Sequence, residues 1–148
     1  MESHAEMSEK NIDTVRKIQA AWNEGRLDEL DQFFASGFDN SQNTPPGMAG
    51  GIAGAKAAHG FMSQAFADRR VDVLEMIADD KSVFVRNRVS GKNAGGVPWL
   101  GIPANGRPFT IESWSVYTFG PDGKVIRHLG LNDMMSMRRQ LMEEPQPA

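Results

Sequence analysis

The sequence contains no cysteine. This absence excludes disulfides, thiolate metal sites and cysteine nucleophiles together. The sequence also lacks an apolar run of the roughly 20 residues that a membrane-spanning helix needs. Its first ten residues are polar and lack the apolar region of a signal peptide. We therefore expect a cytoplasmic protein with no membrane partner.

An excess of basic residues is also missing, because 16 Lys and Arg stand against 19 Asp and Glu and give a net charge of −3. No nucleic-acid surface is therefore expected. The three histidines are scattered and give no metal-ligand signature. No glycine-rich phosphate loop ending in Lys and Ser or Thr occurs either. The sequence thus predicts neither a metal site nor a nucleotide cofactor.

The chain of 148 residues has the size of one domain, with 40% hydrophobic and 24% charged residues. This composition is typical of a folded globular protein. We expect a single domain over residues 1–148, with loose ends at 1–7 and 143–148. No internal repeat interrupts it.

Helical patterns occupy the first half of the chain. Ser8 is a favoured N-cap, apolar residues follow at helical spacing, and Gly25 can end that helix in the left-handed conformation. A shorter helix is predicted from about Leu27. Residues 35–54 show no period and predict a long irregular loop. A third helix is predicted to open at Gly54.

The second half alternates with a period of two, which indicates strands. Strands are predicted at 71–73, 83–89, 109–119 and 125–132. A tight turn at 121–124 joins the last two as a hairpin, and Asp133 precedes a last helical pattern. Helices followed by antiparallel strands favour an α+β domain with helices packed on one face of a curved sheet. Such a curved face is a natural small-molecule pocket.

Four local segments of the sequence resemble those of a known protein family. They are FADRRVDV (66–73), VFVR (83–86), LGIPANGR (100–107) and DGKVIRH (122–128). In this order they resemble the SnoaL-like polyketide cyclase family of the nuclear-transport-factor-2-like superfamily, over about residues 10–142. The resemblance implies a cone-shaped α+β barrel, in which a curved, mostly antiparallel sheet carries helices on its concave side. It also implies a homodimer or homotetramer.

The activity that this resemblance implies is cofactor-free acid/base chemistry on an apolar, oxygenated small molecule, such as cyclisation, isomerisation, hydration or hydroxylation. Where cyclases of the family carry an acidic residue two positions after a histidine, this sequence has His128 followed by Gly130. We expect a cyclase- or isomerase-type enzyme. One alternative is a non-catalytic ligand-binding or interaction module, and another is an acid/base pair moved to Glu112 or His59.

The last predicted strand carries the catalytic candidates. Alternation places His128, Gly130 and Asn132 on one face, and the resemblance turns this face into the cone. His128 can move a proton near neutral pH. Asp133, the nearest acid, is either its catalytic partner or simply the N-cap of the last helix. Asn132 either holds a substrate oxygen or forms a hydrogen bond with a backbone group of the barrel wall.

Other candidates each have a structural alternative. Arg86 either binds the ligand or pairs with Asp133 or Glu112. Glu112 shares strand parity with Trp114, and parity alone leaves open which face looks inward. His59 either points into the cone mouth or lies at the edge of an apolar helix face.

The predicted substrate-binding residues are thus Arg86, Asn132, Glu112, His59, Trp99, Trp114, Phe61, Met62 and Asn40. The aromatic residues and the methionine among them suit a flat aromatic ligand, or else belong to the core. The outer face of so small a sheet needs cover, so we expect a second copy of the chain to pack there.

Overall fold

The structure, a computed structural model, describes residues 2–41, 47 and 49–142. Its elements are α1 (His4–Glu24), η1 (Leu27–Gln32), β1 (Phe34–Asp39), α2 (Gly51–Ala65), β2 (Phe66–Ala78), β3 (Ser82–Asn93), η3 (Pro98–Leu100), β4 (Pro108–Phe119), β5 (Val125–Asn132) and α3 (Met134–Met142). The predicted C-terminal loose end lies outside the described residues. No helix in the described ranges is long and apolar enough to cross a bilayer.

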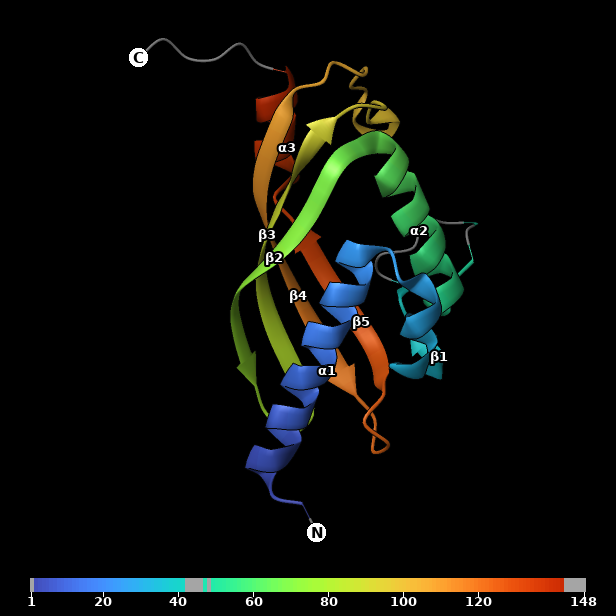
Figure 1. Cartoon of the computed structure of the whole chain (residues 1–148), viewed down its shortest axis with the longest axis vertical. Helices are drawn as coiled ribbons and strands as arrows, with labels where there is room; N and C mark the ends of the chain where they lie inside the picture. The colour runs from blue at the N-terminus through green and yellow to red at the C-terminus, as the bar shows by residue number, and fades with distance from the viewer. Residues whose placement is uncertain (1, 42–46, 48, 143–148) are drawn as a thin grey trace.

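The five strands form one twisted sheet in the order β1-β5-β4-β3-β2. All neighbouring strands are antiparallel except β1, which pairs with β5 in parallel. Helices α1 and α2 lie on the same side of the sheet, while α3 packs against β4 at the opposite end from the N-terminus (Figure 1). The predicted α+β class and the mostly antiparallel sheet are therefore confirmed.

The main core lies between α1 and the concave face of the sheet. Val15, Ile18 and Ala21 follow one another at helical spacing and are completely buried. They belong to one cluster with Val83 and Val85 of β3, which alternate along the strand. The apolar residues that the helical period marks on α1 therefore pack in this layer against those that the strand period marks on β3.

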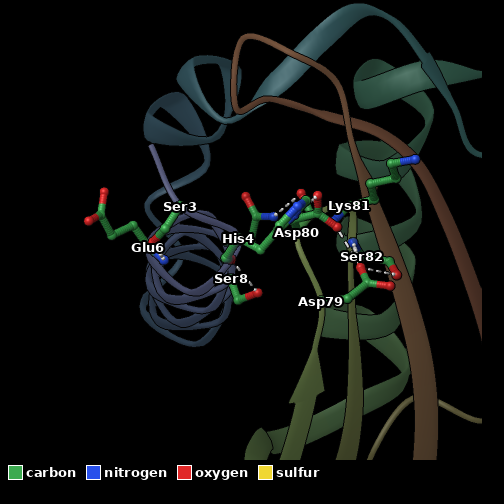
Figure 2. A network of polar contacts seen from close by, with 9 residues as sticks. Ser3, His4, Glu6, Ser8, Asp79, Asp80, Lys81 and Ser82 are labelled. Carbon is green, nitrogen blue, oxygen red and sulfur yellow. Dashed lines mark hydrogen bonds and ion pairs between the residues drawn. The ribbon is translucent and has the colours of Figure 1, made fainter. Parts of the chain in front are cut away.

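The N-terminal helix begins earlier than the sequence suggested. Ser3 is its N-cap and accepts a hydrogen bond from the backbone N–H of Glu6 at 3.1 Å, whereas the Ser8 hydroxyl donates to the His4 carbonyl within the helix. The prediction of Ser8 as the cap is therefore wrong. Figure 2 shows what holds this end: His4 Nδ1 lies 2.5 Å from Asp80 Oδ2, in the turn between β2 and β3.

Strand β1 lies where the sequence predicted the end of a helix and an irregular loop. Its buried residues Phe34 and Phe38 stack edge to face, with ring centroids 4.6 Å apart. Phe34 pairs with Val125, far along the chain. A six-residue strand with a distant parallel partner gives little local signal, which is why alternation did not reveal it. Helix α2 also begins at Gly51 rather than at Gly54.

The segment after β3 is fixed by one buried side chain. Asn93 is completely buried. Its amide Nδ2 donates to the Pro103 carbonyl at 2.9 Å and to Asn105 Oδ1 at 3.1 Å. Its Oδ1 accepts from the Gly96 N–H at 2.9 Å. Asn93 therefore ties both ends of the 94–107 segment to the sheet.

We expect Asn93→Ala to lower the free energy of unfolding by about 2–4 kcal/mol, because it leaves buried backbone groups without partners. Urea unfolding followed by circular dichroism measures this change. Lys92→Ala, at the exposed neighbouring position, is the control and should change stability by less than about 0.5 kcal/mol. Equal stability of the two variants would contradict this role of Asn93.

Candidate functional site

A cavity of about 300 Å³ lies between the concave face of the sheet and the helices α1 and α2. Every strand of the sheet contributes to its wall. The lining residues are Gln19, Trp22, Phe34, Phe38, Asn40, Ala55, Ala58, His59, Met62, Arg69, Val71, Asn87, Val89, Ser113, Ser115, Tyr117, His128, Gly130 and Asn132. The wall thus combines apolar and aromatic side chains with a comparable number of polar ones, which can fix the orientation of a small molecule.

Strand β5 presents its predicted face to this cavity. His128, Gly130 and Asn132 all line it, as strand alternation requires once one of them faces inward. The His128 ring packs against Tyr117 of β4, its register partner, with ring centroids 4.5 Å apart. Gly130 provides space and no titratable group at the position where an acid was expected.

Burial changes the chemistry of His128. It lowers the pKa of the imidazole from 6.5 to about 4, because the charged form loses its hydration. The ring is therefore neutral at physiological pH. Its buried Nε2 has no hydrogen-bond partner within the described part of the chain. A neutral imidazole in this position can accept a proton from a ligand in the cavity or donate a hydrogen bond to it.

Asn87 and Tyr117 are cavity residues that the sequence reasoning missed as site residues. Asn87 is 3% exposed, and its Oδ1 has no hydrogen-bond partner among the residues described. It shares strand parity with the core residues Val83 and Val85, so alternation contained the signal. Burial raises the pKa of Tyr117, so its hydroxyl stays protonated and can donate a hydrogen bond.

His59 of α2 lies on the opposite wall. Its Nε2 is 3.2 Å from the Trp22 carbonyl, and its ring stacks on the Trp22 ring with centroids 4.9 Å apart. Burial lowers the pKa of His59. The ring is therefore neutral and held by α1, with Nε2–H as the donor. Two other predicted residues, Met62 and Asn40, also line the cavity.

Six predicted site residues lie outside this cavity. They are Asp133, Arg86, Glu112, Trp99, Trp114 and Phe61. The three aromatic residues are about half exposed, at 51% for Trp99, 54% for Trp114 and 54% for Phe61. The structure therefore does not bring them to the site that lies around His128.

The open question about strand β4 is answered by its lining residues. Ser113, Ser115 and Tyr117 face the cavity, so Glu112 and Trp114 lie on the outer face. There Arg86 donates to Glu112 at 2.8 Å and lies 3.6 Å from Glu75. The hydrogen bond from Arg86 lowers the pKa of the exposed Glu112 carboxyl. Of the two readings for Arg86, the structure shows the pair with Glu112.

Asp133 is the N-cap of the last helix, which was the alternative to a catalytic role. Its Oδ1 accepts a hydrogen bond from the Ser136 N–H at 3.1 Å, at the start of α3. Its carbonyl accepts from the Met137 N–H at 3.1 Å. This is the geometry of a helix N-cap.

The cavity wall carries no Asp or Glu among the described residues, and Arg69 is its one formal positive charge at neutral pH. The sequence reasoning did not select Arg69, although it lies within one of the four resembling segments. No three His, Asp or Glu side chains converge as metal ligands in the described ranges. The polar inventory of the site therefore consists of neutral groups and one guanidinium.

A curved α+β sheet with helices over its concave face and a cavity between them is the architecture of the cone-shaped folds that hold small molecules. The model of the SnoaL-like polyketide cyclase family matches residues 12–141. The chain therefore belongs to the SnoaL-like polyketide cyclase family. The predicted resemblance is confirmed over nearly the same range.

Solved structures show the same fold. TsrD from Streptomyces laurentii is 24% identical and has a TM-score of 0.79, with 91% of this chain and 96% of TsrD covered. A protein of Jannaschia sp. CCS1 assigned to the SnoaL-like polyketide cyclases is 21% identical with a TM-score of 0.79, covering 98% and 100%. A SnoaL-like polyketide cyclase from Agrobacterium tumefaciens is 19% identical with a TM-score of 0.74, covering 88% and 97%. The comparison with curated proteins finds no match.

We expect the His128 ring to titrate near pH 4, because the buried ring cannot hydrate its charge. Proton NMR of the histidine ring signals over pH 3–8 measures this value. A His128 pKa of 6 or above would contradict the buried, neutral state.

The same shift makes stability depend on pH. The pKa of His128 in the folded protein lies below its unfolded value of 6.5. The unfolded chain therefore binds more protons between the two values, and stability is lost as the pH falls from about 6.5 towards 4. We expect His128→Gln to weaken this dependence in urea unfolding. An unchanged dependence would show that other groups cause it.

Proposed function

We propose that this protein is a cofactor-free enzyme that moves a proton on an apolar, oxygenated cyclic substrate of polyketide type. Membership in the SnoaL-like family supports the substrate class. The observation that carries the proposal is the buried Nε2 of His128, which has no hydrogen-bond partner in the described structure and lies on the cavity wall. A buried, unsatisfied ring nitrogen costs free energy unless a ligand uses it.

The other polar groups support an oxygenated ligand. Asn87 offers an acceptor, Oδ1, that only a donor such as a substrate hydroxyl can satisfy. Tyr117 offers a protonated hydroxyl that can bind a carbonyl or enolate oxygen. Trp22, Phe38 and apolar neighbours on the same wall suit flat rings.

His128 is the acid/base group of the proposed reaction. Its neutral imidazole takes a proton from a carbon next to a carbonyl, and the electron pair of the broken C–H bond passes into an enolate. The enolate carbon then attacks a second carbonyl of the same molecule, which closes a ring. The imidazolium returns the proton to the new alkoxide. The low pKa of His128 makes the imidazolium a strong acid for this return, and it makes the neutral ring a weaker base in the first step.

We expect the protein to accelerate exchange of the C2 protons of 1-tetralone, a neutral bicyclic ketone, in D₂O. His128→Gln should slow this exchange by about 100-fold or more, the usual contribution of a positioned acid/base group. NMR measures the loss of the proton signal. His4→Gln, at an exposed position outside the cavity, is the matched control and should exchange at the wild-type rate. Equal rates for His128→Gln and the wild type would contradict the proposal.

A non-catalytic binding module is the second candidate, and one observation favours it. The cavity wall includes no carboxylate among its described residues, and Gly130 stands at the position where a cyclase acid was expected. On this reading the wild type would bind 1-tetralone without accelerating exchange. The same NMR experiment therefore separates the two candidates.

We also propose that the outer face of the sheet packs against a second copy of the chain. Trp114 of β4 and Leu131 of β5 are register partners on this face and are 54% and 71% exposed. Ile77 of β2 is 62% exposed. Large apolar side chains gathered on one face are typical of subunit interfaces.

We expect Leu131→Asp to convert the wild-type dimer or tetramer to a monomer, because it places a charge in the apolar contact. Sedimentation velocity at micromolar concentration measures the change. Arg16→Glu, on the exposed side of α1, is the control and should leave the assembly intact. A wild-type protein that sediments as a monomer would contradict the proposed interface.

A further inference from the structure

Arg69 lies in the cavity wall without a counter-charge. No carboxylate lies within ion-pair distance of its guanidinium in the described ranges of the chain, and no hydrogen bond to it is formed there. The nearby acids are engaged elsewhere: Asp68 lies 3.8 Å from Lys92, and Glu24 pairs with Arg26 at 2.5 Å. Burial lowers the pKa of Arg69. A guanidinium always stays charged in proteins, so this charge is poorly solvated and unbalanced.

An irregularity in strand β2 sets the direction of the Arg69 side chain. Ala67 pairs with Lys92, but the next regular pair joins Arg70 to Ser90, so the two residues between them on β2 face Gly91 alone. This is a β-bulge, a device that redirects a side chain. Asp68 takes a positive φ of 54°, a conformation that costs free energy for a residue other than glycine.

Gly91 permits this bulge. A Cβ there would lie 3.2 Å from the Phe109 ring and 3.3 Å from the Ala67 carbonyl. The strand alternation after the bulge also matters, because Arg70 turns outward, where its side chain is 65% exposed and donates to Asp72 at 2.7 Å. The two adjacent arginines therefore differ: Arg70 pairs with Asp72 in solvent, and Arg69 lines the cavity with no partner among the described residues.

The groups that line the main cavity together with Arg69 are neutral. His59 of α2, which shares its wall, is held neutral by burial and by the charge of Arg69 itself. Trp22, His59 and Arg69 line both the main cavity and a neighbouring one of about 410 Å³. Glu24 of α1 and Asp68 of β2 line that neighbouring cavity, but within the described ranges neither forms an ion pair with Arg69.

We propose that the substrate supplies it: the cavity takes a substrate that carries a carboxylate, and Arg69 binds that carboxylate with its paired N–H groups. This inference rests on the proposed function, since it names the substrate class of the same cavity. A planar guanidinium matches the two oxygens of a carboxylate. A carboxylate has one charge and balances one Arg, whereas a phosphate monoester carries −1.5 to −2.

The position of Arg69 also sets which part of the substrate it holds. Arg69 is on β2 and His128 is on β5, with β3 and β4 between them. Three strand spacings amount to roughly 14 Å along the sheet. The carboxylate is therefore remote from the carbon that loses its proton, and Arg69 orients the substrate rather than taking part in proton transfer.

The test compares the binding of two ligands by calorimetry: a 1-tetralone with a carboxylate on its aromatic ring, and the methyl ester of the same compound. We expect the wild type to bind the carboxylate about 10-fold or more tightly than the ester, because hydrogen bonds to charged groups add this much. Arg69→Met should remove this preference and leave the affinity for the ester unchanged. Arg69→Lys keeps the positive charge but loses the planar guanidinium with its paired N–H groups, so it should retain part of the preference.

Arg70→Met is the matched control, since it removes the adjacent arginine from the outer side of the strand. It should keep the wild-type preference. Equal binding of acid and ester by the wild type, or a preference that survives Arg69→Met, would overturn the proposal. Binding needs no proton transfer, so this test fails or succeeds independently of the exchange experiment on His128.

Stability supplies a second readout. Removing a partly buried charge that has no partner among the described residues should leave the free energy of unfolding of Arg69→Met equal to or above that of the wild type in ligand-free protein. The carboxylate ligand should raise the melting temperature of the wild type and not that of Arg69→Met. A ligand-free Arg69→Met protein that is markedly less stable would show that Arg69 has a structural partner, and would overturn the proposal.

Discussion

The packing of α1 against the concave face of the sheet determines where the rest of the molecule lies. Val15 and Ile18 are completely buried in a cluster with Val83 and Val85. The apolar residues of α1 cover one part of the concave face, and Gln19 and Trp22, near the end of the helix, line the cavity beside it. The site is thus the part of a curved sheet that its covering helix does not fill.

Strand alternation then divides the polar residues between two environments. Glu112 and Arg86 meet on the outer face, where solvent reaches both. Tyr117 and His128 meet on the inner face, where burial keeps both neutral. Because a strand has a side-chain period of two, a shift of one residue in register would exchange these groups. The absence of acids from the described cavity wall follows from this division and leaves the charge of Arg69 as its main electrostatic feature.

Much of this arrangement could be predicted from the sequence. Alternation grouped His128 with Asn132, and the family resemblance predicted the fold. The site prediction failed for residues whose environment depends on distant partners. Asp133 caps a helix, and Arg86 pairs with a side chain 26 residues away. Arg69 was missed because the predicted strand began only at 71; alternation continued back from Val71 places Arg69 on the cavity face.

The sequence by itself determined which residues share a helix or strand face, because helical and strand periods are local properties of the chain. It also determined that Gly130 provides no acid beside His128. Only the tertiary structure decided which face of β4 looks inward, that β1 pairs with β5, and that Arg69 has no counter-charge among the described residues while Arg70 has one. Burial and charge pairing depend on groups that are brought together from distant parts of the chain, so no local pattern encodes them.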